Sequence, residues 1–325
     1  MGKLSVIIPV YKPGKELGEL LDKIRIQTVK PERVFLLWTV PYDVNESDVR
    51  KSAGRFTGGS VEVHYIRQQD FDHGGTRRYG MSLAGTDYAL CMTQDAVPYD
   101  NLLFENLINA MECEDDEDNE HNVTAAVYAR QLPREDAGAI EKITRDFNYP
   151  DKDRVQNLDS FDRYGIKTYF CSDVCAMYRL DRYNEVGGFV SKTIFNEDML
   201  MASALIGAGY TVRYVAEAKV VHSHHYSYME QYRRNFDLAV SHRQYSEVFD
   251  SVPSEGEGIR LVLSTMRQLT YMGKVYLIPD LIIQSAFKYM GYRCGKRYEK
   301  LSMKKIIRKT MNKSYWVNSR SGENG

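Results

Sequence analysis

The first hundred residues alternate between short apolar runs and segments with helical spacing, and this alternation constrains the fold more than any other feature. The opening run, Leu4–Val10, is rich in β-branched residues, as in a strand buried on both faces of a sheet. Similar runs follow at residues 33–40, 61–66 and 88–93, with a glycine-led helical segment over residues 74–83. Such alternation predicts an α/β fold in which helices cover both faces of a parallel sheet.

Composition limits the classes of function. The chain has 325 residues, 43% of them hydrophobic, which suits one large α/β domain with an extension or two modest domains. The 43 Lys and Arg against 44 Asp and Glu give a formal net charge of -1. Because no overall basic field is present, we expect no nucleic-acid partner.

Several features predict a soluble, cytoplasmic protein. The five cysteines are odd in number and irregularly spaced, which argues against a disulfide framework. The N-terminal residues lead directly into the first strand without a signal-peptide pattern. The best candidate for a membrane helix, residues 275–292, is interrupted by Pro279, Asp280, Gln284 and Lys288.

The first candidate site combines one carboxylate with two histidines. Asp95 ends an apolar strand, where ligands collect in parallel sheets. His222 and His224 follow another apolar strand, and residues two apart in an extended chain point to the same side. A carboxylate and imidazoles suit Mn²⁺ or Mg²⁺ bridging a diphosphate. The alternative is that Asp95 caps the next turn and that the histidines are ordinary loop residues.

The second candidate site is a segment that contains His73, Gly74, Gly75, Arg77 and Arg78. The glycines allow close approach of the backbone, and a helix that starts there would offer N–H groups to a phosphate. The arginines add donors that keep their charge. A glycine pair alone more often marks a turn, but this combination after a strand indicates a donor-binding segment.

The third candidate is Asp198, with Glu197 beside it, in the first turn of an expected helix. A carboxylate there could accept a proton from an attacking hydroxyl. Spacing alone does not separate this role from helix capping, because Asp is a common capping residue.

Together these motifs resemble the inverting family-two glycosyltransferases, which have the GT-A fold. The match spans roughly residues 1–245 and rests on Ser5–Tyr11, Gly187–Phe189, Glu197–Asp198, Gly209–Tyr210 and Ala218–His222. The rhamnosyltransferase branch is indicated by residues 71–77, 93–96, 222–227 and 231–237. The resemblance implies a mixed, mostly parallel sheet flanked by helices over residues 1–245, followed by a helical, basic extension over residues 246–325.

The branch resemblance also implies a function. It is the transfer of L-rhamnose from dTDP-L-rhamnose to a saccharide acceptor, which can be lipid-linked, in bacterial O-antigen, capsule or cell-wall polysaccharide synthesis. Asp198 would be the general base, and Asp95 would bind the metal with His222 or His224. The resemblance and the segments above give these donor-binding residues: Pro9, Val10, Tyr11, His73, Gly74, Gly75, Arg77, Gln94 and Asp95.

Three departures from the family pattern keep alternatives open. Gln94-Asp95-Ala96 retains one acid of the D-x-D motif, so the need for a metal is open. Residues 38–43 replace the usual Asp-Asp-Gly-Ser, and Asn235 replaces the Trp of the Q-x-x-R-W motif of processive synthases. A nucleotidyltransferase acting on sugar phosphates and a degenerate glycan-binding or scaffold subunit are the alternative functions.

Two later segments carry structural predictions. Residues 134–164 are polar and aperiodic, which predicts a long loop. Residues 288–313 hold ten Lys or Arg and one acid, with Met303, Ile307 and Met311 at intervals of four. A helix with this apolar stripe could lie on anionic lipid at the inner face of the cell membrane. The alternative is packing on the body of the protein or on a second subunit, which would make a homodimer.

Overall fold

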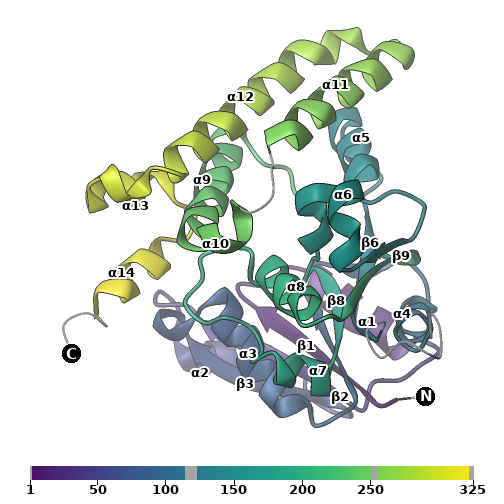
Figure 1. Cartoon of the computed structure of the whole chain (residues 1–325). Helices are drawn as coiled ribbons and strands as arrows, with labels where there is room; N and C mark the ends of the chain where they lie inside the picture. Colours follow the sequence, from purple (N-terminus) through teal and green to yellow (C-terminus); the bar gives the residue numbers. More distant parts are fainter. Residues whose placement is uncertain (1, 114–122, 251–254, 322–325) are drawn as a thin grey trace. The chain divides into compact units, whose positions relative to one another are not determined.

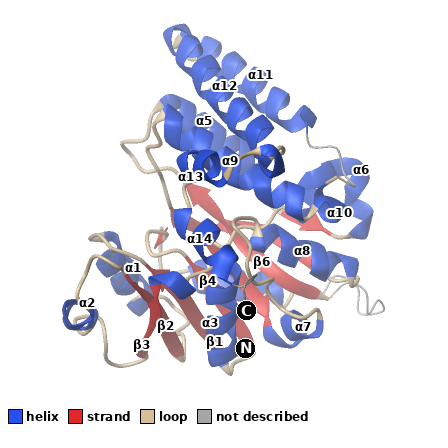
Figure 2. Cartoon of the chain, turned by 90° about the vertical axis from the view of Figure 1, so that its left-hand side faces the viewer, coloured by secondary structure: helices blue, strands red, loops and turns tan. Residues whose placement is uncertain are grey.

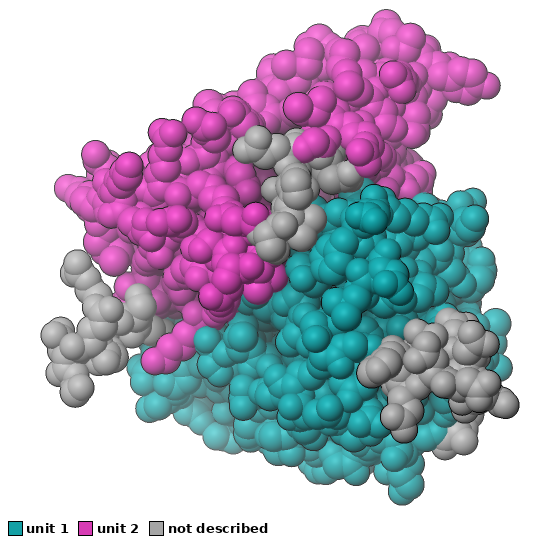
Figure 3. Space-filling model, in the orientation of Figure 1, with its two compact units in different colours: residues 1–132, 150–191, 197–222 teal, residues 133–149, 192–196, 223–325 magenta. Residues whose placement is uncertain are grey.

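The computed structural model describes residues 2–113, 123–250 and 255–321, which fall into two compact units (Figure 3). The first unit comprises Met1–Leu132, Pro150–Ser191 and Glu197–His222, and the second Pro133–Tyr149, Lys192–Asn196 and Ser223–Gly325. Each unit therefore draws on several stretches of the sequence. The boundary expected between residues 245 and 246 stays a prediction.

The first unit is built on a nine-stranded sheet, seen in red in Figure 2. Its strands are β1 (Leu4–Val10), β2 (Arg33–Val40), β3 (Val61–Arg67), β4 (Tyr88–Met92), β5 (Val97–Pro98), β6 (Thr124–Leu132), β7 (Arg154–Gln156), β8 (Cys175–Arg179) and β9 (Thr211–Val221). They follow the order β3-β2-β1-β4-β8-β6-β9-β5, and β7 pairs with β9. All strands except β5, β7 and β8 run in one direction, which confirms the mixed, mostly parallel sheet.

Helices cover both faces of this sheet (Figure 1). Those of the first unit are α1 (Glu16–Arg25), α2 (Glu46–Ala53), α3 (His73–Ala84), α4 (Leu103–Met111), α6 (Phe161–Tyr164), α7 (Leu180–Glu185) and α8 (Glu197–Gly207). Helices α1 and α4 share a buried core with Val6 and Ile8 of β1. Helix α3 lies on the opposite face, where a Cβ at Gly80 would be 2.4 Å from Cγ2 of Ile7. The glycine-led helix is therefore confirmed, and glycine permits its close approach to the sheet.

The second unit is helical. Its helices are α5 (Ala139–Asn148), α9 (Tyr228–Gln244), α10 (Ser246–Phe249), α11 (Glu255–Tyr271), α12 (Ile278–Gly295), α13 (Met303–Lys309) and α14 (Lys313–Ser321). Helices α11 and α12 run side by side as an arm (Figure 1). Leu269 and Leu281 of this arm form a buried cluster with Ile140 and Ile143 of α5.

The prediction of a long loop over residues 134–164 was wrong. This stretch contains α5, β7 and α6. In α5 the apolar residues Ala139, Ile140, Ile143 and Phe147 recur among polar residues. Ile140, Ile143 and Phe147 follow one another at intervals of three and four residues, as in an amphipathic helix, so the sequence did contain a signal for α5.

The single basic helix expected over residues 288–313 is not continuous in the structure. Helix α12 ends at Gly295, α13 begins at Met303, and Met311 lies beyond the end of α13. Met303 and Ile307 pack against a buried cluster that includes Trp316. Their side chains are therefore used inside the second unit. Among the described helices, none combines the length and the apolar character that a membrane span requires.

We expect Gly291→Ala to destabilise the second unit. A Cβ at Gly291 would lie 2.2 Å from the carbonyl oxygen of Tyr232 in α9, so the two helices would have to separate. The expected loss in the free energy of unfolding is about 1–3 kcal/mol, measured by urea denaturation. Gly18→Ala in α1 is the matched control, because nothing lies within 4 Å of the added Cβ. It should stabilise the protein by about 0.5–1 kcal/mol. A Gly291→Ala variant as stable as the wild type would contradict the close packing of α9 and α12.

Candidate active site

The candidate residues gather at one edge of the sheet. Strands β1, β4, β6 and β9 end at this edge, and the antiparallel β8 begins there, since Met92 of β4 pairs with Cys175 of β8. Strand β1 lies between β2 and β4, so the chain reverses its direction of travel across the sheet at this point. A crevice beyond the strand ends is expected at such a switch point, and ligands bind in it.

Gln94 joins the end of β1 to the end of β4. Its Oε1 accepts a hydrogen bond from the backbone N–H of Tyr11 (2.8 Å), and its Nε2 donates to the carbonyl oxygen of Tyr11 (3.0 Å). Tyr11 is 41% exposed, whereas Val10 is buried and Pro9 half-buried. Of these three residues, Tyr11 thus has the side chain most accessible to a nucleotide.

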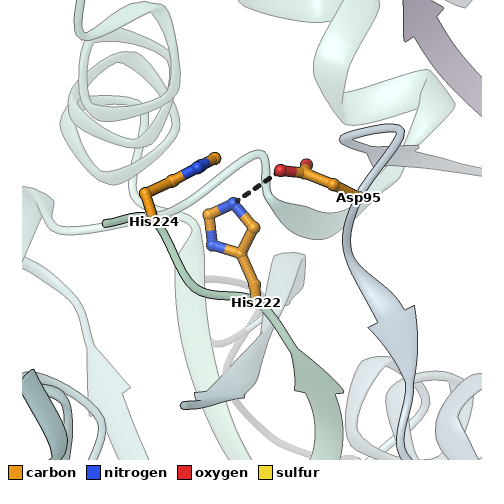
Figure 4. Close-up of side chains that lie close together, drawn as sticks. All are labelled: Asp95, His222 and His224. Carbon is orange, nitrogen blue, oxygen red and sulfur yellow. Dashed lines mark ion pairs between the residues drawn. The ribbon is translucent and has the colours of Figure 1, made fainter. Parts of the chain in front are cut away.

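Asp95 and His222 lie close together at the ends of β4 and β9 (Figure 4). The His222 Nε2 atom is 3.7 Å from Asp95 Oδ2, and the two side chains are 8% and 25% exposed. The other ring nitrogen, Nδ1, is 3.1 Å from Gln131 Oε1. Because Gln131 Nε2 donates to Ser172 Oγ (2.9 Å), its amide oxygen is turned toward the histidine.

This arrangement favours one tautomer of His222. Nδ1 carries the proton and donates it to Gln131, which leaves the lone pair of Nε2 on the side of Asp95. An imidazole nitrogen and a carboxylate oxygen at this separation form a donor set that fits Mn²⁺ or Mg²⁺. Protonation of the imidazole would instead give a simple ion pair with Asp95.

His224 is two residues beyond His222 and belongs to the second unit, which resumes at Ser223. Its side chain is exposed, and its ring stacks on that of Tyr226 with a centroid distance of 5.1 Å. Residues two apart in an extended chain point to the same side, so His224 stays the candidate for a further metal ligand after His222.

Arg77 lies in a buried cluster of carboxylates. It is 5% exposed; its Nη1 donates to Glu197 Oε1 (2.8 Å), and its Nε lies 3.2 Å from Asp173 Oδ2. The Tyr178 hydroxyl donates to Asp173 Oδ1 (2.6 Å). The guanidinium is therefore engaged by acidic groups inside the first unit, and its contact with a nucleotide base or diphosphate stays a prediction.

Asp198 stands in the first turn of α8, where it was expected. Its Oδ1 accepts the N–H of Met199 (2.8 Å), and its Oδ2 accepts the N–H of Asp173 (3.3 Å). Burial, with the nearby carboxylates of Glu197 and Asp173, raises the pKa of Asp198 to about 8. Burial likewise raises the pKa of Asp173 to about 6. Proton affinity in this range suits a general base that works near neutral pH.

The N-terminus of α3 is capped by the protein itself. The Asp72 carboxylate accepts the N–H of Gly75 (2.6 Å), and Arg78 Nη1 donates to the carbonyl oxygen of Phe189 (3.0 Å). A phosphate at this helix end would meet the negative charge of Asp72. The structure thus gives Gly75 and Arg78 internal partners, and donor contacts of His73 and Gly74 stay predictions.

Gln131, Ser172 and Asp173 were not among the site residues predicted from the sequence. Ser172 bonds to the glutamine that holds His222, and the next residue, Asp173, bonds to Asp198. These adjacent residues therefore link the Asp95–His222 pair to the carboxylate cluster. A signal was present, because Asp173 is the one acid in a mostly apolar stretch, residues 170–178, and directly precedes a buried strand.

Comparisons with known proteins identify the family of this chain. Residues 5–187 match the model of Glycosyl transferase family 2. The chain is 34% identical over 324 residues to the O-antigen chain rhamnosyltransferase RfbN of Salmonella typhimurium, with 97% of this chain and 96% of that protein covered. It is also 34% identical over 321 residues to the O-antigen chain rhamnosyltransferase WbaN of Salmonella anatum, with 98% and 97% covered.

A solved structure shows the same fold. The mannosyltransferase PcManGT from Pyrobaculum calidifontis, in complex with GDP-Man and Mn²⁺, superposes with a TM-score of 0.54 at 15% sequence identity, over 99% of this chain and 87% of that one. This likeness confirms the GT-A fold. With a family match over more than half its length and relatives aligned from end to end, the chain is a glycosyltransferase and belongs to glycosyl transferase family 2.

Proposed function

We propose that this protein transfers L-rhamnose from dTDP-L-rhamnose to a lipid-linked saccharide at the cytoplasmic face of a membrane, in O-antigen synthesis. The observation that carries the proposal is the end-to-end similarity to two proteins that are both named O-antigen chain rhamnosyltransferases. A nucleotidyltransferase or a scaffold subunit has no comparable support. The inferred reaction is a single displacement that inverts the configuration at the sugar carbon.

In this proposal Asp95 and His222 hold a divalent cation, and His224 is the further ligand. His222, directly after β9, would supply the second ligand atom, which in a D-x-D motif comes from the other acid. Gln131 orients the imidazole through the bond to Nδ1. When bound, the cation would neutralise negative charge on the departing diphosphate.

Asp198 is proposed to take the proton of the acceptor hydroxyl as its oxygen attacks the sugar carbon opposite the nucleotide. Its two backbone hydrogen bonds fix the direction of the carboxylate. Arg77 offsets the charge of Asp173 and Glu197, so that Asp198 can ionise beside them. Tyr11, held by Gln94, would line the nucleotide pocket together with Pro9 and Val10.

Donor turnover tests the proposal. Purified protein is mixed with Mn²⁺ or Mg²⁺ and a panel of nucleotide sugars, and the released nucleoside diphosphate is measured. Selective release of dTDP from dTDP-L-rhamnose is expected. Release of UDP or GDP from another sugar nucleotide would overturn the donor assignment, and release of pyrophosphate would indicate nucleotidyl transfer. Absence of donor binding in a thermal-shift assay would favour the scaffold function.

Asp95→Ala is expected to lower this turnover by about 100-fold and to raise the cation concentration needed for half-maximal activity. The reason is the loss of the carboxylate that faces His222 Nε2. A titration of dTDP release against Mn²⁺ concentration measures both effects. Asp159→Ala removes an exposed carboxylate and serves as the control. An unchanged Mn²⁺ dependence in Asp95→Ala would contradict the metal site.

A further inference from the structure

The arm formed by α11 and α12 exposes an apolar surface that the proposed active site does not use. Of the 23 large hydrophobic side chains that are exposed among the described residues, ten lie between residues 259 and 290. Tyr271 is 94% exposed, Tyr276 71% and Ile259 65%. So dense a group in one short stretch of chain indicates a binding surface rather than scattered exposure.

The two sides of the arm differ. Leu269 and Leu281 are buried against α5, so one side is packed within the second unit. On α12, Ile282, Ile283 and Tyr289 are 52%, 43% and 62% exposed. Their spacing places them on one face of the helix, which is therefore an apolar face outside the core.

The charge along the arm is net positive. Residues 255–297 contain seven Lys or Arg and three acids, and the acid on α12 is Asp280. That acid accepts hydrogen bonds from the Tyr228 hydroxyl and from the Gln284 amide (2.8 Å) within the second unit. The surface thus combines apolar and tyrosine side chains with basic residues.

We infer that the α11–α12 arm docks the protein on an anionic lipid surface. Tyrosine side chains favour the boundary between lipid and water, and basic residues are attracted to anionic headgroups. A second copy of the chain fits less well, because a two-fold contact between identical arms would bring the same positive charges together. The lipid site is therefore on α11 and α12, upstream of the stripe at Met303 and Ile307 that packs internally.

This inference deepens the proposed function, since a lipid-linked acceptor would lie in the surface to which the arm binds, but its test does not depend on turnover. The full-length protein is floated with vesicles of phosphatidylcholine alone and with vesicles that contain equal parts of phosphatidylglycerol and phosphatidylcholine. Binding to the anionic vesicles is expected, with weaker binding at high salt.

The variant Ile282→Gln with Ile283→Gln should reduce binding to the anionic vesicles by about tenfold or more. Both side chains are exposed, so the fold and the release of dTDP from free donor should not change. The control is Ile26→Gln with Leu158→Gln, which alters side chains that are 56% and 53% exposed in the first unit. The control should bind like the wild type.

Three outcomes would overturn the inference. They are wild-type protein that floats with neither vesicle, equal binding to both vesicle types, and equal loss of binding in the arm variant and the control. A wild-type dimer in light scattering that the arm variant converts to monomers would identify the face as a contact between copies. Loss of dTDP release with intact vesicle binding would instead count against the proposed function alone.

Discussion

Asp198→Asn is expected to slow sugar transfer by about 10²–10⁴-fold while donor binding is retained, because the variant keeps the shape of the side chain and loses its proton affinity. Product formation under single-turnover conditions measures the first effect, and a donor thermal shift the second. Asp181→Asn is a matched control, since Asp181 is also the second residue of its helix and accepts the N–H of the following residue. Equal activities of the two variants would remove Asp198 from the mechanism.

The same variant should change how stability depends on pH. The pKa of Asp198 is about 8 in the folded protein and about 4 in the unfolded chain, so the folded state binds the extra proton between these values. The contribution of this carboxyl to stability is therefore full at acid pH and is lost as pH rises toward 8. Asparagine does not ionise, so the stability of Asp198→Asn relative to the wild type should rise between about pH 4 and about pH 8. A difference in melting temperature that is constant over this range would contradict the buried environment.

Much of the fold could be predicted because its elements have strong local patterns. The β-branched run of β1 and the glycine-led start of α3 were both located from sequence. The place of β8 between β4 and β6 could not be predicted, because a short apolar run does not indicate which strands it pairs with. Helix α5 was missed although Ile140 and Ile143 have helical spacing, because more than half of its residues are polar. The residues that bury it, Leu269 and Leu281, are far away in the chain.

The candidate site, like the fold, could be predicted only in part. Asp95 and His222 could be paired because strands that run in one direction end at a common edge. The role of Arg77 was harder to infer, although a signal existed: Arg77, Gly80, Met81 and Ala84 share the spacing of one helix face, and all four are buried. What the sequence could not supply was the identity of the acids that meet this arginine, because Asp173 and Glu197 come from distant segments.

Arg77→Met is expected to lower the free energy of unfolding by about 3–5 kcal/mol, because it leaves buried carboxylates without their cation. Arg77 lowers the pKa of both Asp173 and Asp198, so its removal raises these pKa values further above those of the unfolded chain. The deficit should therefore be small near pH 4 and grow as pH rises. Urea denaturation at acid and at neutral pH measures the loss in the free energy of unfolding and its dependence on pH. Arg78→Met, next to it on α3, is the control with an expected change of about 0.5–1.5 kcal/mol, since that residue is exposed and loses only its hydrogen bond to the Phe189 carbonyl oxygen.

The experiment also decides between two roles of Arg77. If the arginine mainly balances the acids beside Asp198, the variant loses stability and Arg77→Lys recovers part of it, because the charge is kept although the paired geometry of the guanidinium is lost. If the arginine instead contacts the diphosphate, as the family resemblance implied, Arg77→Met keeps its stability and weakens donor binding. The buried ion pairs with Asp173 and Glu197, at 3.2 and 2.8 Å, favour the first result. In the proposed mechanism these ion pairs make Arg77 a residue that positions and tunes the base, and Asp198 is the residue that would contact the acceptor.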